Sequence, residues 1–378
     1  MTEMNVDYDI HGLLGVRLID PAPSLARAAA RQFNPLRPAT LGGEPDVTIS
    51  HRRRSYGMRR YRLGDAGDSL ESEFDETGFT LLSRDEELSI PFDSLGRSCA
   101  IACTPNSAMR RLLINYVRPA LHVCLLSKGA MALHSAAVSF NGKGILLAGW
   151  AESGKTEAML GLLQAGASFV SDKWTIVDGD GSSIHHFPTP ITVRDWMIDL
   201  IPGLRDHLGG ADRLRARAAG AAGSLLSAKG ALSRLPLSSQ AKGLADLAGR
   251  VSVTPSQLTG SPGDGGSQWD RLSSVPLHAL FLLQTTRDQQ ISVRPGHANE
   301  VAPRLADCAM YERRAFFSLY ERFRYALPER RNLLIESARE TESGLLASAL
   351  SSKRVFIVEV SFPFNPSALR EAIAPYCQ

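Results

Sequence analysis

The sequence predicts a mixed α/β fold, and three observations lead to this class. Short alternating apolar runs between residues 46 and 104 are typical of antiparallel strands. The segment "GILLAGWAESGKTEAMLGLL" (144–163) has the pattern of an apolar strand, a glycine-containing loop and a helix. Two further helical stretches follow near 301–326 and 329–350. Strands and helices are therefore interspersed along one chain.

The composition is that of an ordinary globular protein. The 378 residues suffice for one large domain or two moderate ones, and 44% of them are hydrophobic against 21% charged. The formal net charge of +3 is too small to imply nucleic acid or an anionic membrane as a partner. The longest apolar runs, such as "GILLAG" and "ALFLL", are too short to cross a bilayer. We expect no nucleic acid and no membrane among the partners.

The number and spacing of the cysteines, together with the first residues of the chain, indicate the cellular compartment. An odd number of cysteines without zinc-finger spacing fits poorly with a disulfide framework and favours a reducing environment. These are Cys99, Cys103, Cys124, Cys308 and Cys377. The opening "MTEMNVDYDIHG" (1–12) is acidic and polar, unlike a signal peptide. We therefore expect a cytoplasmic protein.

The N-terminal third is expected to be rich in strands. Residues 8–19 alternate and predict one strand, and "PAPSLARAAARQF" (21–33) predicts a helix opened by proline. Residues 46–104 follow as a meander of antiparallel strands, punctuated by Gly, Asp and Asn. The segment "MRRLLINYVRPALHVCLLSKG" (109–129) predicts helical turns on either side of Pro119.

Two paired-strand units surround the glycine-containing loop. Within residues 131–150, two apolar strands flank "NGKG", which is a strong hairpin signal. The second of these strands leads into the loop, and the helix that follows ends at Gly166. Residues 167–187 then have the pattern of a strand, a "DGDG" turn and a return strand.

The rest of the chain contains an insertion between regular elements. Residues 205–272 are rich in Ala, Gly and Ser, and we interpret them as an inserted helical or mobile segment. Apolar strands follow at 275–285 and 354–362, and "PSALREAIAPY" closes the chain as a helix. We expect an N-terminal β-rich accessory region at 1–105, a core at 106–350 that holds the insertion, and a closing strand–helix unit at 351–378.

The loop matches G-x-x-x-x-G-K-T, from Gly149 to Thr156. In such a loop the backbone N–H groups form a nest for phosphate oxygens, and the next helix directs its positive end at them. In such a loop Lys155 would reach the β- and γ-phosphates, and the Thr156 hydroxyl would ligate Mg²⁺. A chance match is the alternative, against which the flanking strand and helix argue. The residues expected to bind the nucleotide are Gly149, Trp150, Ala151, Glu152, Ser153, Gly154, Lys155, Thr156 and Glu157.

A magnesium site of this kind needs a second acid on a neighbouring strand. Asp172 in "FVSDKW" (169–174) stands at the end of an apolar run and supplies it, so the expected metal ligands are Thr156 and Asp172. The alternative is an aspartate that only ends a strand. Two loop positions also stay open. Trp150 either stacks on a base or covers the phosphates, and Glu157 either favours the helix N-terminus or supports the metal.

The segment "ALHSAAVSFNGKGILLAGWAESGKTEAMLGLLQAGASFVSDKWTIV" (132–177) resembles the catalytic core of HPr kinase/phosphorylase and of the looser group of HPr-kinase-like proteins. Phosphoenolpyruvate carboxykinase is a more distant relative by fold. His134 precedes the loop, Glu157 follows Gly-Lys-Thr, "GA" ends the helix, and the acidic motif comes last. The resemblance implies a P-loop kinase core of HPr-kinase type, with ATP and Mg²⁺ as cofactors.

A weaker similarity extends through "FPTPITVRDWMIDLIPGL" (187–204) to HPr-kinase-like proteins found beside peptide-modification systems, including lasso-peptide tailoring kinases. The glycine-rich signature of true HPr kinases is replaced here by "HHFPTPITVRDW", so HPr is not the expected substrate. The expected function is transfer of the γ-phosphoryl group of ATP to a hydroxyl of a peptide or small-molecule acceptor. HPr kinases assemble as oligomers, so the resemblance also implies a homo-oligomer.

The family usually has two adjacent aspartates, whereas here Lys173 follows Asp172. Three interpretations stay open. Lys173 points away from the site by strand alternation, leaving Asp172 for the metal and His134 as the base. Alternatively, Lys173 enters the site and neutralises charge on the transferring group. In the third interpretation the base is lost and the protein is a nucleotide-binding pseudokinase. His134 itself is either that base or a satisfied core histidine.

Other polar residues are weaker candidates. Arg194 either clamps a phosphate or an acidic substrate, or lies at the surface. The basic cluster "HRRRSYGMRRYR" (51–62) is interpreted as a solvated hairpin, with docking of an acidic peptide as the alternative. The rival function from another class is a non-catalytic nucleotide-binding partner of a biosynthetic enzyme. A carboxykinase-like enzyme lacks support, because no second metal-binding constellation is found.

Overall fold

A computed structural model gives the fold of the chain as two compact units. The structure describes residues 4–51, 61–63, 71–75, 78–83, 86–104, 113–194, 198, 204–208, 210, 250–259, 274–288, 290–361 and 364–378. Residues 1–188 with 272–378 form the main unit, and residues 189–271 form the inserted unit. Strands and helices occur in both, which confirms the mixed α/β class. No helix among the described residues is long and apolar enough to cross a membrane.

The first sheet of the main unit contains the N-terminal strands in the order β1-β2-β3-β8-β7-β6-β5-β4. They are β1 (Asn5–Ile10), β2 (Leu14–Ile19), β3 (Val47–His51), β4 (Tyr61–Leu63), β5 (Glu71–Asp75), β6 (Gly78–Ser83), β7 (Glu86–Ser89) and β8 (Cys99–Cys103). The helix α1 (Pro23–Gln32) connects β2 to β3 as a crossover, so these two strands run parallel. β3 is also parallel to β8.

Two N-terminal predictions are wrong in detail. The single strand expected over 8–19 is a hairpin of β1 and β2, because His11 (φ 57°) and Gly12 (φ 70°) adopt left-handed conformations that reverse the chain. The meander expected over 46–104 is antiparallel only from β4 to β8, since the α1 crossover brings β3 in parallel. Residues 52–60 lie outside the described residues.

The second sheet of the main unit has nine strands among the described residues. Its order is β12-β10-β11-β17-β14-β13-β9, with β19 beside β17 and β18 beside β19. They are β9 (Ala130–Leu133), β10 (Ser135–Phe140), β11 (Lys143–Gly149), β12 (Ser168–Ser171), β13 (Thr175–Asp178), β14 (Ser183–His186), β17 (Val275–Thr286), β18 (Ser292–Pro295) and β19 (Arg354–Ser361). The parallel strands β11, β17 and β19 are neighbours, and their apolar residues form much of the core.

The hairpin predicted at "NGKG" is confirmed. β10 and β11 pair antiparallel, and Asn141 (φ 52°) and Gly142 (φ 75°) have the left-handed conformations of a type I′ turn. The closing strand–helix unit expected at 351–378 is not a separate region. β19 pairs with β17 inside the second sheet, and α15 (Pro366–Ile373) packs on α4 (Lys155–Gln164).

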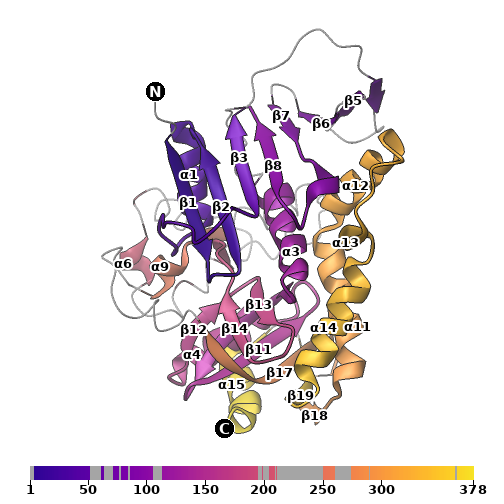
Figure 1. The fold of residues 1–378 in the computed structure, drawn as a ribbon. Helices are drawn as coiled ribbons and strands as arrows, with labels where there is room; N and C mark the ends of the chain where they lie inside the picture. The colour runs from indigo at the N-terminus through magenta and orange to yellow at the C-terminus, as the bar shows by residue number, and fades with distance from the viewer. Residues whose placement is uncertain are drawn as a thin grey trace, which may run out of the picture. The chain divides into compact units, whose positions relative to one another are not determined.

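Further helices of the main unit are α3 (Arg118–Ser127), α11 (Ala298–Glu312), α12 (Arg314–Ala326), α13 (Leu333–Glu336) and α14 (Ala338–Leu350). The helices α3, α11 and α14 contact the second sheet, whereas α12 contacts β5 of the first sheet. Figure 1 shows the long pair α11 and α14 side by side. Each helix expected in this C-terminal region is thus two helices. Within the helix expected at 109–129, a π-helical turn, η2 (Leu113–Val117), leads into α3, and Pro119 lies in the first turn of α3. Residues 109–112 lie outside the described residues.

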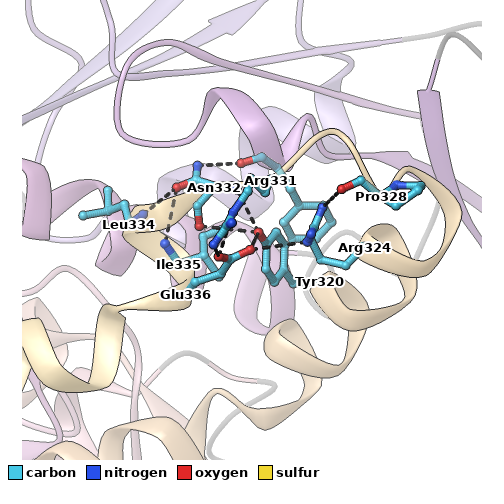
Figure 2. A network of polar contacts seen from close by, with 9 residues as sticks. Tyr320, Arg324, Pro328, Arg331, Asn332, Leu334, Ile335 and Glu336 are labelled. Carbon is cyan, nitrogen blue, oxygen red and sulfur yellow. Dashed lines mark hydrogen bonds and ion pairs between the residues drawn. The ribbon is translucent and has the colours of Figure 1, made fainter.

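A buried polar network fixes the start of α13, as Figure 2 shows. The side chain of Asn332 accepts from the backbone N–H groups of Leu334 (2.9 Å) and Ile335 (3.3 Å). Its amide nitrogen donates to the carbonyls of Phe92 (2.7 Å) and Leu95 (2.9 Å), which belong to the 3₁₀ turn η1 (Phe92–Ser94) and its end. One side chain therefore caps a helix and joins it to the N-terminal sheet region.

The inserted unit starts earlier than the insertion expected at 205–272. β15 (Ile191–Arg194) and β16 (Arg250–Val253) pair antiparallel, with the short helices α6 (Leu204–His207) and α9 (Pro255–Thr259) in the same unit. Residues 211–249 and 260–273 lie outside the described residues.

Candidate functional site

The G-x-x-x-x-G-K-T segment, residues 149–156 and hereafter the GKT loop, connects the end of β11 to the start of α4. Gly149 has φ 147°, and a Cβ there would lie 2.4 Å from the Leu283 carbonyl oxygen of β17. Gly154 has φ 89°, and a Cβ there would lie 3.0 Å from the ring of Phe364. Both positions therefore need glycine, because the loop is folded tightly against its neighbours. The strand–loop–helix arrangement is the one expected from the motif.

Lys155 spans the GKT loop. Its ammonium donates to the carbonyl oxygens of Gly149 (3.0 Å) and Trp150 (2.6 Å), and its side chain is buried. Burial lowers the pKa of Lys155, and the acids Asp172 and Glu312 oppose this shift. The hydroxyl of Ser153, also buried in the loop, has no hydrogen-bond partner among the described residues. The loop thus presents a cation and an unpartnered hydroxyl, which are groups that suit phosphate oxygens.

Thr156 and Asp172 meet across the start of α4. The hydroxyl of Thr156 lies 3.3 and 3.4 Å from the two carboxylate oxygens of Asp172. Burial raises the pKa of Asp172 to about 6, against the opposing effects of the Lys173 backbone N–H and the Lys155 ammonium. Within the described part of the chain no three acidic, histidine or cysteine side chains gather as a metal site. The pair fits Mg²⁺ that takes its other ligands from phosphate and water.

Asp172 and Lys173 lie in a bend between β12 and β13, and not on a strand as expected. The hydroxyl of Ser171 donates to the carbonyl of Trp174 and closes the bend, and Lys173 has φ 73°. Strand alternation therefore gives no reason to turn Lys173 away from Asp172. Its positive charge lowers the pKa of both Asp172 and His134, so the charge acts at the site.

His134 also lies in a bend, between β9 and β10, and not on the expected strand. Its ring is 5.1 Å from that of Trp174, its Nδ1 is 3.5 Å from Cys308 Sγ and 4.0 Å from a carboxylate oxygen of Glu312. Burial, followed by the charges of Lys155 and Lys173, holds the pKa of His134 well below its ordinary value. The imidazole is therefore neutral, and the cations around it weaken it as a base.

Sequence reasoning missed four residues that the fold brings to this site. Cys308 lies between His134 and the loop, with Sγ 3.5 Å from the Gly149 carbonyl oxygen. Arg118, at the start of α3, has its guanidinium carbon 5.7 Å from the centre of the Trp174 ring. Glu312 and Phe364 complete the set through the contacts given above. One signal was visible in the sequence, because Arg118 and His122 are polar residues spaced four apart in the apolar run "RPALHVCLL".

The other residues singled out in the sequence lie in the GKT loop, in α4, in the inserted unit and in the first sheet. Trp150 is 51% exposed and lies 4.7 Å, ring centre to ring centre, from Tyr311, which is 42% exposed. Glu152 has φ 59°, and with Ala151 it forms the outer part of the loop. Glu157 stands in the first turn of α4 and raises the pKa of Lys155. Arg194 ends β15 in the inserted unit. Of the basic cluster, Arg62 forms an exposed ion pair with Glu71.

In comparisons with known proteins, no protein-family model matches the chain, and no curated protein matches its sequence.

Proposed function

We propose that the chain is an ATP-dependent, HPr-kinase-like phosphotransferase that transfers the γ-phosphoryl group to a hydroxyl of a peptide or small-molecule acceptor. One observation carries the proposal. The Thr156 hydroxyl faces the Asp172 carboxylate at 3.3 Å, at the start of the helix that follows a glycine loop spanned by Lys155. A hydroxyl and a carboxylate opposite a lysine are the groups that Mg²⁺ and a triphosphate require.

The residues around the loop suit the parts of a phosphoryl transfer. Bound Mg²⁺–ATP would supply the γ-phosphoryl group. A bond forms from the acceptor oxygen to the γ-phosphorus, the bond from that phosphorus to the β,γ-bridging oxygen breaks, and ADP leaves. Lys155 would balance the phosphate charge, and Thr156 and Asp172, which lie within hydrogen-bond distance of each other, would hold the metal.

The acceptor proton goes to His134. Burial raises the pKa of Cys308 to about 11, so this residue is a thiol that donates to the Gly149 carbonyl. The imidazole then carries its own proton on Nδ1, directed at Cys308 Sγ and Glu312. Nε2 is left with the lone pair that accepts a proton.

A nucleotide-binding pseudokinase is the second candidate, and Lys173 is the observation that favours it. The ammonium stands where the family has an acid, and it lowers the pKa of His134, the only base the proposal has. Loss of general-base assistance slows a reaction by about 10²–10⁴-fold. The two candidates share the nucleotide site and differ in turnover.

The test is ATP binding and turnover with Mg²⁺ for the native chain and for Lys155→Met, Asp172→Asn and Lys173→Asp. The matched control is Lys143→Met, which changes a lysine at the other end of β11. We expect Lys155→Met and Asp172→Asn to lose turnover by about 10²-fold or more, with Lys143→Met like the native chain.

The outcomes separate the candidates. Tight binding without turnover, together with turnover gained in Lys173→Asp, identifies a pseudokinase. Turnover in the native chain that falls in Lys173→Asp means that the ammonium assists the transfer. If the native chain and Lys155→Met bind ATP equally weakly, the kinase proposal is wrong.

A further inference from the structure

Arg118 is a buried cation that has no matching acid among the described residues. The residue is 8% exposed, and its Nε has no hydrogen-bond partner within the described residues. No carboxylate of the described chain lies within ion-pair distance of it, and Glu312 acts on it only through longer-range attraction. Its close contact is the face of Trp174. Buried arginines normally pair with an acid, because an unpaired charge is costly to remove from water.

Two neighbours of Arg118 also have unpartnered polar atoms. Trp174 Nε1 and both ring nitrogens of His122 have no hydrogen-bond partner among the residues described, and both side chains are fully buried. The rings of His122 and Trp174 are 4.3 Å apart, centre to centre, and His122 follows Arg118 by one turn of α3. Arginine and tryptophan can only donate hydrogen bonds. Arg118, Trp174 and His122 are hereafter called the donor cluster. Their hydrogen-bond donors are unused, because the described residues around them offer too few acceptors.

The donor cluster adjoins His134. Trp174 contacts the His134 ring at 5.1 Å, and its other neighbours in the cluster are Arg118 and His122. Lys155, by contrast, is bonded to the loop carbonyls. The charges of Lys155 and Arg118 both lower the pKa of His134, so the GKT loop and the donor cluster both act on this imidazole.

We propose that the donor cluster holds an oxyanion, a phosphate or carboxylate group, carried by the phosphoryl acceptor beside the hydroxyl that His134 deprotonates. The inference rests on the proposed function and narrows its acceptor. An oxyanion supplies the acceptors that Arg118, Trp174 and His122 lack, and the planar guanidinium matches its geometry. Because all three side chains are at least nine-tenths buried, the group must be small. The acceptor is therefore an acidic small molecule and not a neutral peptide hydroxyl.

The first arm of the test measures thermal unfolding of the full chain without ligand. Arg118→Met removes an unpaired buried charge, so we expect the midpoint to rise by about 2 °C or more. The matched control is Arg313→Met. Arg313 is also buried, but it pairs with Glu342 and donates from Nε to the Ala309 carbonyl (3.0 Å). That substitution leaves Glu342 unpaired and lowers the midpoint. A purely structural Arg118 would behave like Arg313.

The second arm adds inorganic phosphate after the loop has been saturated with Mg²⁺ and a non-hydrolysable ATP analogue, with sodium chloride keeping the ionic strength constant. We expect phosphate to raise the midpoint of the native chain further. Arg118→Met should lose this rise, and Arg118→Lys should need at least about tenfold more phosphate, because an ammonium lacks the planar fork.

Three results decide whether the inference and the proposed function stand. If phosphate has no effect on the native chain, the donor cluster holds only water, and the inference is wrong. It is also wrong if Arg118→Met weakens binding of the ATP analogue tenfold but not that of ADP, because Arg118 then holds the γ-phosphate. If the analogue fails to bind but phosphate still stabilises the chain through Arg118, the oxyanion site stands and the proposed function alone fails.

Discussion

Asn332 and Arg118 are both buried polar residues at the start of helices in the main unit, but their surroundings differ. Every polar atom of the Asn332 side chain has a partner, in two backbone N–H groups and two backbone carbonyls. Arg118 stands in a cluster where Nε, an indole nitrogen and two imidazole nitrogens have none among the described residues. A matched network stabilises the fold, whereas an unmatched one destabilises it until a ligand supplies the missing partners.

The largest expected effect comes from a substitution that disrupts the matched network around Asn332. Asn332→Ala removes four hydrogen bonds and leaves the carbonyls of Phe92 and Leu95 buried without their donor, so we expect the free energy of unfolding to fall by about 3–4 kcal/mol. Asn365→Ala is the matched control, because Asn365 caps α15 in the same way but is exposed and has no carbonyl partners of this kind within the described part of the chain. It should cost about 1 kcal/mol in chemical denaturation. Equal losses would contradict the role assigned to the Asn332 amide.

A second test concerns the support behind the GKT loop. A Cβ at Gly161 of α4 would lie 2.3 Å from the Pro366 carbonyl oxygen of α15, so Gly161→Ala must push the two helices apart. We expect a loss of about 2 kcal/mol in stability and weaker ATP binding, since Phe364 beside Gly154 moves with α15. Gly344→Ala is the control. Gly344 lies in α14 with open space around it, so the same substitution should stabilise the chain by up to about 1 kcal/mol.

The third prediction concerns His186, a buried histidine that makes the stability of the chain depend on pH. Burial lowers the pKa of His186 to about 3, and the imidazole donates from Nδ1 to the Val170 carbonyl (3.0 Å). The folded chain keeps His186 neutral, whereas the unfolded chain binds a proton below about pH 6.5. This contribution to stability is therefore complete above pH 6.5 and is lost as the pH falls towards 3.

The His186→Gln variant keeps a donor but cannot titrate. At pH 5.5 the native chain should have lost about 1.4 kcal/mol more stability, relative to pH 7.5, than the variant. His122 and His134, whose pKa values burial also lowers, titrate in both proteins and cancel in the difference. Parallel stability curves for the two proteins between pH 7.5 and 5 would mean that His186 is accessible to protons in the folded chain.

The sequence predicted the parts of the site that neighbouring residues determine. The GKT loop follows from its glycines, since Gly149 and Gly154 need positive φ wherever the loop occurs. The hairpin at Asn141 follows from the same local chemistry. Asp172 was found because its distance from the loop along the chain is short, although the bend that presents it was taken for a strand end.

The parts that were missed depend on contacts between distant segments. Arg118 approaches Trp174 from a helix more than fifty residues away. Because α3 is buried on all sides from Arg118 to Leu126, its sequence does not indicate which neighbour each residue meets. Cys308 and Glu312 reach His134 because α11 lies against the sheet, which no local pattern encodes. His134 itself was expected on a continuous strand. The chain bends there because β9 pairs with β13, while β10 pairs with β11 and β12.

The smallest expected effect concerns the outer edge of the GKT loop, where the contact is between two aromatic rings and involves no buried hydrogen bonds. The Trp150 ring packs at a tilt against that of Tyr311 of α11, and the guanidinium carbon of Arg314 lies 4.3 Å from the centre of the Tyr311 ring. Both rings are partly exposed, so Trp150→Ala and Tyr311→Ala should each change stability by less than about 1 kcal/mol. A double-mutant cycle should give a coupling of about 0.5–1 kcal/mol. A coupling near zero means that the Trp150 and Tyr311 rings are not in contact in solution, and then Trp150 is free to cover a bound nucleotide. A coupling in the expected range means that the loop is tied to α11, the helix that also brings Cys308 and Glu312 to His134.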